Sequence, residues 1–210
     1  NTENAEFWKK LEPLDLVTKE KSERKSALPE LLQEPSLQFV WFEIISDDCN
    51  ESCVHCYADS MPPAYRKAMG IPTGGFIPME QVAGDKKEVK KISFEEWREL
   101  ITDSHSLGCR RCQFIGGEPT LYRGENGETV FDLAEHAKNI GFEFIEIFTN
   151  ATMLTKEKIQ RIKELGLNVA VSLYSSDEKI HESITKTPGS FRKTTQALEL
   201  LKEEGIPTRV

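Results

Sequence analysis

Three cysteines lie close together in one short stretch: Cys49, Cys53 and Cys56, in the run CNESCVHCY. Thiolates are soft ligands, and three of them at this spacing suit an iron-sulfur cluster. A four-iron cluster held by three thiolates keeps one iron without a protein ligand, where a further molecule can bind. The stretch follows an apolar run, 38–45, that is typical of a buried strand. The sequence therefore predicts a metal centre directly after the first strand.

A second run, Gly116-Gly117-Glu118-Pro119, follows another predicted strand, 113–115. Two glycines let a ligand come close to the backbone, and Glu118 supplies an acceptor for an ammonium group. A turn with a solvated glutamate is the simpler explanation of this run by itself. Its position one strand-helix unit after the cysteines favours a binding role.

The remaining cysteines, Cys109 and Cys112, leave two alternatives open. Together with Cys53 and Cys56 they form two C-x2-C pairs, which is the spacing of a structural zinc site. That interpretation leaves Cys49 without a role and does not explain the glycine run. Alternatively, Cys109 and Cys112 are buried thiols, since free cysteines are often found in cores. An added role for this pair, as auxiliary ligands or redox thiols, also remains open.

The composition restricts the class of protein. The chain has 210 residues, 38% of them hydrophobic, with a net charge of −8 and a pI near 5.2. The acidic balance argues against a nucleic-acid surface, and no run is apolar and long enough for a membrane span or signal peptide. An odd number of cysteines favours metal binding in a reducing compartment over disulfides. We therefore expect a cytoplasmic protein with no nucleic-acid or membrane partner.

The elements that must position these residues alternate between strand and helix. Strands are predicted at 38–45, 113–115, 142–148, 167–173 and 206–210. Helices are predicted at 93–108, 130–140, 155–166 and 190–205, with a capping box of Ser93 and Glu96 and an N-cap at Ser190. This alternation predicts an α/β fold with a parallel sheet, comprising four complete βα units and the start of a fifth. Functional loops then lie at the carboxyl ends of the strands.

Two regions fall outside this pattern. Residues 1–36 are predicted to be a charged leader segment preceding a core domain at 37–210. Residues 58–90 contain several prolines and glycines and then a charged run, so they are either a flap over the cysteine loop or an inert insertion.

The C-x3-C-x2-C spacing, the aromatic Tyr57 beside it and the later Gly-Gly-Glu-Pro run together resemble the radical S-adenosylmethionine (SAM) enzymes. The resemblance implies a partial (β/α)6 barrel, here truncated after about four and a half units. It implies that Cys49, Cys53 and Cys56 hold a [4Fe-4S] cluster whose fourth iron is chelated by SAM, and that reductive cleavage yields a 5′-deoxyadenosyl radical that abstracts hydrogen from a substrate. The SAM-contacting residues that it implies are Gly116, Gly117, Glu118, Pro119, Asn150, Ser172, His55 and Tyr57.

The stretch from Val171 to Phe191, with VSLYSS, His181, Thr185 and PGSF, resembles the SPASM or twitch subgroup, many of whose members modify ribosomally made peptides. This implies a peptide or protein substrate, an external electron donor such as flavodoxin or ferredoxin, and a longer chain with a C-terminal auxiliary-cluster domain beyond Val210. A radical SAM enzyme of small-molecule or cofactor biosynthesis is one alternative, and a non-catalytic zinc-stabilised interaction module is another. No catalytic residue is assigned, and His181 is given no catalytic role.

Overall fold

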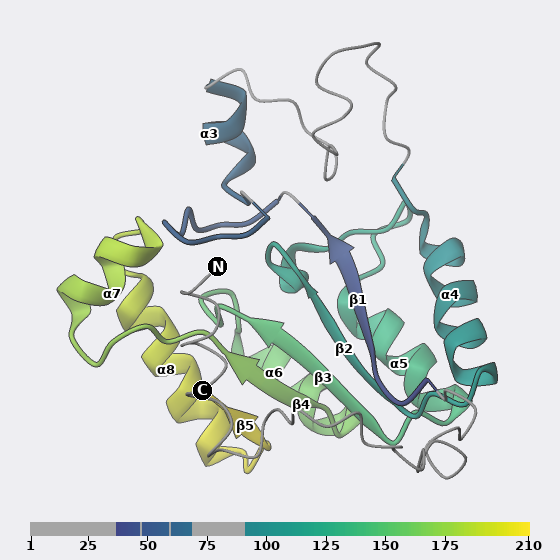
Figure 1. Cartoon of the computed structure of the whole chain (residues 1–210). Coiled ribbons are helices and arrows are strands. Elements are labelled where there is room, and N and C mark those ends of the chain that lie inside the picture. Colours follow the sequence, from purple (N-terminus) through teal and green to yellow (C-terminus); the bar gives the residue numbers. More distant parts are fainter. Residues whose placement is uncertain (1–36, 47, 59, 69–90) are drawn as a thin grey trace, which may run out of the picture. The chain divides into compact units, whose positions relative to one another are not determined.

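The computed structural model describes residues 37–46, 48–58, 60–68 and 91–210. They contain one parallel sheet of five strands in the order β1-β2-β3-β4-β5, and within this part of the chain the sheet is open (Figure 1). The strands are β1 (Val40–Ile45), β2 (Arg111–Gly116), β3 (Phe144–Thr149), β4 (Asn168–Val171) and β5 (Thr208–Arg209). The connecting elements are α3 (Pro63–Ala68), α4 (Phe94–Ser106), the 3-10 helix η3 (Pro119–Leu121), α5 (Val130–Ile140), α6 (Lys156–Leu165), α7 (Glu178–Thr185) and α8 (Ser190–Glu203). The predicted α/β partial barrel is confirmed.

Local signals explain where the helices begin and end. The predicted capping box of Ser93 and Glu96 is present at the start of α4, and Thr129 forms a second one ahead of α5. Gly141 and Gly166 take left-handed conformations after α5 and α6, which favour glycine and stop the helix. These caps fix the lengths of the crossovers and so the positions of the strand ends.

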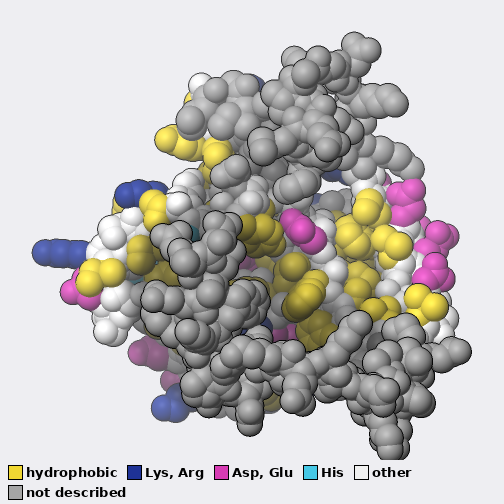
Figure 2. Space-filling view, in the orientation of Figure 1, with side chains coloured by type: hydrophobic (Ala, Val, Ile, Leu, Met, Phe, Trp, Pro, Cys, Tyr) yellow, Lys and Arg dark blue, Asp and Glu magenta, His cyan; other side chains and the backbone are white. Residues whose placement is uncertain are grey.

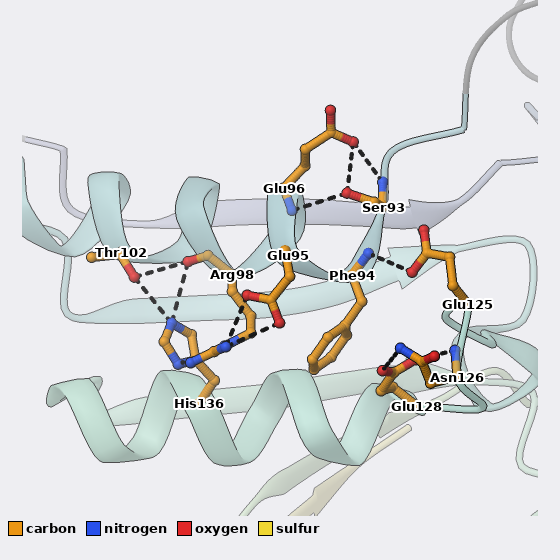
Figure 3. A network of polar contacts seen from close by, with 10 residues as sticks. All are labelled: Ser93, Phe94, Glu95, Glu96, Arg98, Thr102, Glu125, Asn126, Glu128 and His136. Carbon is orange, nitrogen blue, oxygen red and sulfur yellow. Dashed lines mark hydrogen bonds and ion pairs between the residues drawn. The ribbon is translucent and has the colours of Figure 1, made fainter.

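Helix α4 lies alongside α5 through a polar network (Figure 3). Arg98 of α4 donates from Nε to Nδ1 of His136 at 3.4 Å, and Thr102 Oγ1 lies 3.0 Å from His136 Nε2. The pKa of His136 is lowered, first by burial and then by the charge of Arg98. The two helices therefore meet around a neutral imidazole.

Alternate side chains of the strands face the helices and form the core. The core includes, from the strands, Phe42, Ile44, Cys112, Phe114, Ile145, Ile147, Val169 and Val171, and from the helices Trp97, Ile101, Leu133, Ala137, Ile159, Ile162 and Leu201. This packing anchors each strand, and with it the loop that follows its carboxyl end.

The other face of the sheet carries exposed apolar side chains, among them Trp41 and Phe148, and Figure 2 shows hydrophobic groups gathered on it. A hollow of about 480 Å³ lies near the amino ends of the strands on this face. Its lining includes Glu146, which accepts from Gln113 Nε2 and forms an ion pair with Arg209 at 2.9 Å. This hollow lies at the opposite end of the strands from the cysteine loop.

Three expectations need correction or a limit. The N-cap of α8 is Gly189 and not Ser190, which is the first helical residue and whose Oγ lies 2.9 Å from Thr185 Oγ1. Helix α7 was not predicted, because residues 178–185 carry only a short apolar pattern; His181 lies within this helix. The leader at 1–36 and most of the stretch at 58–90 lie outside the described residues. Among the described residues, none of the helices is long and apolar enough to cross a membrane.

Candidate metal centre and cofactor site

The cysteine loop follows β1 and is closed by hydrogen bonds between its two ends. Cys49 N donates to the Met61 carbonyl at 3.3 Å, and Ser60 Oγ donates to the Ser46 carbonyl at 2.8 Å. These bonds join the two ends of the loop. The three cysteines are consequently confined to one closed segment at the carboxyl end of the first strand.

The loop also rests on the end of α7. Ser52 N donates to the Thr185 carbonyl at 3.0 Å, and Val54 N donates to the Ile184 carbonyl at 2.9 Å. The last carbonyls of a helix have no intrahelical partner, so they are available to accept from another segment. The helix that the sequence did not predict therefore fixes the backbone on both sides of Cys53.

N–H donors lie near the sulfur atoms of Cys49 and Cys56. Glu51 N lies 3.4 Å from Cys49 Sγ, and Ser60 N lies 3.4 Å from Cys56 Sγ. The Asn150 amide lies 3.8 Å from Cys49 Sγ. Hydrogen bonds of this kind to cysteine sulfurs stabilise thiolates and tune iron-sulfur clusters. The donor set fits the cluster that the cysteine spacing predicts.

The thiols of Cys49 and Cys53 are protonated when no metal binds them. Burial is the main cause that raises the pKa of Cys49 to about 12, and the nearby Glu118 and Glu51 add to it. Burial likewise raises the pKa of Cys53 to about 12, again with a contribution from Glu51. The pKa of Glu51 itself is raised to about 7, chiefly by burial. Metal ligation therefore has to displace thiol protons, as is general for cysteine sites.

The alternative zinc site of four thiolates is not formed. Cys112 pairs with Val40 at the start of β1, whereas Cys53 and Cys56 lie in the loop that follows the end of that strand. Five strand steps separate the two ends, about 17 Å at 3.3 Å per residue. Cys109 and Cys112 are fully buried in the core, where Cys109 Sγ donates to the Arg111 carbonyl at 3.2 Å. Among the described residues, no group of three or more His, Cys, Asp or Glu side chains lies close enough together to hold a metal ion.

The two glycines of the second run make close backbone contacts. A Cβ on Gly116, whose φ is +129°, would lie 1.8 Å from the Ile45 carbonyl oxygen, and one on Gly117 would lie 2.1 Å from that of Asp48. Gly117 N donates to Ile45 at 2.6 Å and Glu118 N donates to Asp48 at 3.1 Å. The close approach that requires glycine here is to the backbone leading into the cysteines.

Glu118 is fully buried, and its carboxylate joins the ends of two strands. Oε1 accepts from Thr120 N at 3.0 Å, from Thr120 Oγ1 at 2.6 Å and from Thr149 Oγ1 at 2.7 Å. Oε2 accepts from Asn150 N at 2.8 Å. These contacts support a structural role in shaping the rim, and the predicted contact to an ammonium group stays a prediction.

Asn150 connects the third strand to the cysteine loop. Its Nδ2 donates to Asn50 Oδ1 at 2.9 Å and lies near Cys49 Sγ, while its Oδ1 accepts from Thr152 Oγ1 at 2.7 Å. Its carbonyl accepts from Thr194 Oγ1 of α8 at 2.8 Å. The structure therefore brings Asn150, Glu118 and the first cysteine into one network.

The other predicted site residues lie around this network. Ser172 N donates to the Thr149 carbonyl at 3.2 Å, which places Ser172 beside the end of β3. His55 is exposed, and its ring meets the ring of Tyr174 edge-on at 4.7 Å. Tyr57 is 74% exposed, so its ring is available to a ligand. Pro119 is buried as the first residue of η3.

Sequence reasoning gave no role to several polar residues of the rim: Asn50, Glu51, Thr120, Thr149, Thr152 and Tyr174. One signal could have found Thr149 and Thr152, because the run Thr149-Asn150-Ala151-Thr152 places three polar side chains at the end of a buried strand and directly after it. Ala151 in this run has a φ of +63°, and its N donates to Thr149 Oγ1 at 3.0 Å. The chain therefore turns directly after β3, and the Thr149 side chain stabilises this turn.

Comparison with known proteins places this arrangement in a family. The profile of the Radical SAM superfamily matches residues 44–210. The subtilosin biosynthesis protein AlbA of Bacillus subtilis is 27% identical over 164 residues, 77% of this chain and 30% of AlbA. The Fe-coproporphyrin III synthase of Methanosarcina barkeri is 31% identical over 159 residues, 75% of this chain and 32% of the synthase. The chain thus spans about a third of the length of these relatives.

A solved structure shows the same fold. Streptococcus suis SuiB bound to S-adenosylmethionine aligns with a TM-score of 0.57 and 15% identity, covering 82% of this chain and 33% of SuiB. SuiB bound to its precursor peptide SuiA aligns with a TM-score of 0.56. The superfamily uses a [4Fe-4S] cluster together with SAM. This agrees with the three cysteines of the loop and with the backbone N–H groups that donate to the sulfurs of Cys49 and Cys56. With the profile matching most of its length, the chain belongs to the radical SAM superfamily.

Proposed function

We propose that this chain is the core of an enzyme that cleaves SAM reductively and uses the resulting 5′-deoxyadenosyl radical to abstract hydrogen from a ribosomally made peptide or a protein. The observation that supports it best is the loop carrying Cys49, Cys53 and Cys56, with N–H donors at the sulfurs of Cys49 and Cys56. That loop faces the network of Glu118 and Asn150 at the adjoining strand ends.

The chain's own residues hold and enclose the cofactors in this proposal. Cys49, Cys53 and Cys56 ligate the cluster. SAM lies against the rim formed by Gly116, Gly117, Glu118, Pro119, Asn150, Ser172, His55 and Tyr57. The exposed ring of Tyr57 is suited to cover the adenine, and the Ser172 hydroxyl is suited to bond a polar group of SAM. Bringing the reacting groups into register, and excluding water from them, is the contribution expected of the protein.

The peptide substrate rests on the relatives. AlbA is named for bacteriocin biosynthesis, and SuiB has been solved with a precursor peptide. The Fe-coproporphyrin III synthase favours a second candidate, an enzyme of cofactor biosynthesis, because it shares 31% identity with this chain.

The five cysteines are free. Free thiols suit the cytoplasm, where an external electron donor such as a flavodoxin or ferredoxin would reduce the cluster.

Metal and product analysis tests the cofactor part of the proposal. After anaerobic reconstitution, we expect iron and acid-labile sulfide in the protein, and 5′-deoxyadenosine from SAM under reducing conditions. Cys53→Ala should lose both. Cys109→Ala is the matched control, because Cys109 is a buried thiol of the core, away from the loop, and should keep both. Normal 5′-deoxyadenosine formation by Cys53→Ala would exclude the assignment.

Isotope transfer tests the substrate part. The full-length protein is incubated with SAM and a deuterated candidate peptide, taken from short reading frames beside its gene. Deuterium in the 5′-deoxyadenosine would show that hydrogen comes from the peptide. Transfer from a deuterated iron porphyrin, and none from any peptide, would replace the first candidate by the second.

A further inference from the structure

The cysteine loop adjoins a basic segment of an otherwise acidic chain. Between Ser183 and Leu198 the sequence contains Lys186, Arg192 and Lys193 and no Asp or Glu, whereas the whole chain has 27 basic and 35 acidic residues. These three side chains, the basic patch, are exposed, and none of them forms an ion pair with another described residue. Their charges are therefore available to a partner.

Backbone hydrogen bonds hold this segment against the cysteine loop. Lys186 is the C-cap of α7 and directly follows Thr185, whose carbonyl accepts from Ser52 N at 3.0 Å. Arg192 and Lys193 lie in the first turn of α8, which packs against α7 (Figure 1). The basic patch thus belongs to the two helices that support the loop.

An exposed apolar side chain of the loop lies next to these helices. Val54 is 62% exposed, and its N donates at 2.9 Å to the carbonyl of Ile184, two residues before Lys186. Val54 also directly follows Cys53 in the sequence. Apolar contact area and unpaired positive charge are therefore both present beside a predicted cluster ligand.

The acidic groups of α7 do not cancel this charge. Asp177 and Glu178 stand at the start of the helix, at the opposite end from Lys186. Glu182 accepts a hydrogen bond from Gly189 N at 2.6 Å, so its carboxylate is engaged with the turn between α7 and α8. The positive charge is greatest at the end of α7 that meets the cysteine loop.

We propose that the basic patch and Val54 form the docking surface for an acidic electron-carrier protein that reduces the cluster. Interfaces combine apolar contact with a polar rim, and opposite charges steer two proteins together and fix their register. In the docked complex the carrier loses one electron and the cluster gains it. Because Val54 is adjacent to Cys53, a carrier bound here lies beside the cluster. The inference rests on the proposed function, since only a cluster that must be reduced needs such a partner.

The test compares two double variants with the same chemical change. Lys186→Glu/Lys193→Glu reverses two charges of the basic patch, and Lys91→Glu/Lys202→Glu reverses two exposed charges outside it. Reduction of the reconstituted cluster by a reduced acidic flavodoxin is followed by stopped-flow absorbance. At low ionic strength we expect the patch variant to react at least about tenfold more slowly than the wild type, and the control variant within about twofold. High salt should remove the difference, because it screens exposed charges.

Two further measurements separate this proposal from the proposed function. Dithionite, a small reductant, should reduce the cluster equally fast in both variants. Titration of the metal-free proteins with oxidised flavodoxin needs no cluster, and the patch variant should bind about tenfold more weakly at low salt. Equal reduction rates by flavodoxin in the wild type and the patch variant would overturn the proposal. So would loss of peptide-dependent turnover by the patch variant with dithionite as reductant, because the surface would then hold the substrate.

Discussion

Replacing Glu118 by Ala is expected to destabilise the fold strongly, before any effect on catalysis is considered. The carboxylate is fully buried and accepts from two backbone N–H groups, those of Thr120 at 3.0 Å and Asn150 at 2.8 Å. It also accepts from the hydroxyls of Thr120 and Thr149. The hydroxyls can rotate to other acceptors, but the backbone donors cannot.

The size of the loss follows from those two donors. A buried donor left without a partner costs about 1–3 kcal/mol, so two of them predict a loss of about 2–6 kcal/mol. This is a large part of the roughly 5–15 kcal/mol that stabilises a typical domain. Glu118→Gln keeps one carbonyl oxygen as an acceptor and should lose about half as much. Glu143→Ala removes an exposed glutamate next to β3 and should change stability by less than about 0.5 kcal/mol.

Urea unfolding of the metal-free variants, followed by circular dichroism, measures these differences. If Glu118→Ala lost less than about 1 kcal/mol, the carboxylate would not be holding the strand ends together. If Glu118→Gln lost as much as Glu118→Ala, the count of acceptors would not explain the effect.

Three further outcomes are expected. Gly116→Ala should prevent iron loading, because its Cβ would lie 1.8 Å from the carbonyl oxygen at the end of β1. Gly127→Ala is the control and should load iron normally, because Gly127 also has a positive φ but has open space around it. Equal iron content in the two variants would contradict this prediction. Stability should fall as the pH drops below about 6.5, because the lowered pKa of His136 makes the unfolded state bind the proton more readily. Full stability is present above that pH, and replacing His136 by Leu should flatten the decline in unfolding experiments between pH 7.5 and 5.5. Thr194→Val keeps the shape of the side chain but leaves the Asn150 carbonyl without its donor. The free energy of unfolding, measured by heat or urea, should fall by about 1–3 kcal/mol. An unchanged value would show that this hydrogen bond does not stabilise the end of β3.

The fold could be predicted from sequence because its signals are local. The capping box at Ser93, the glycines after α5 and α6, and the apolar runs of the strands each report on a few neighbouring residues. Helix α7 was missed although Asp177 caps its start, because the helix is only 8 residues long. The true cap of α8 was missed because Gly189 makes no side-chain cap bond. His181 packs against Tyr174 and Phe191, and Thr185 meets Ser190. No pattern within residues 178–185 announces those partners.

The candidate site, like the fold, could be predicted from the sequence only in part. The three cysteines and the glycine run could be recognised by spacing. What the glycines contact could not, because their nearest neighbours are carbonyls of Ile45 and Asp48, about seventy residues earlier. Likewise, no sequence rule predicts that Asn150 donates to Asn50, or that the ring of Tyr174 meets that of His55. Such contacts depend on the register of the parallel strands and on how each crossover returns.

The dependence of the cysteine loop on α7 has a consequence for how the protein is made. The loop is synthesised early, but the carbonyls that hold Ser52 and Val54 belong to residues 185 and 184. Between Val54 and Ile184 a ribosome adds 130 residues, which takes about 6 to 26 s at 5–20 residues per second. Throughout that interval the nascent loop lacks its final support. We therefore expect iron and sulfide to be delivered to a chain that has been translated at least as far as α7.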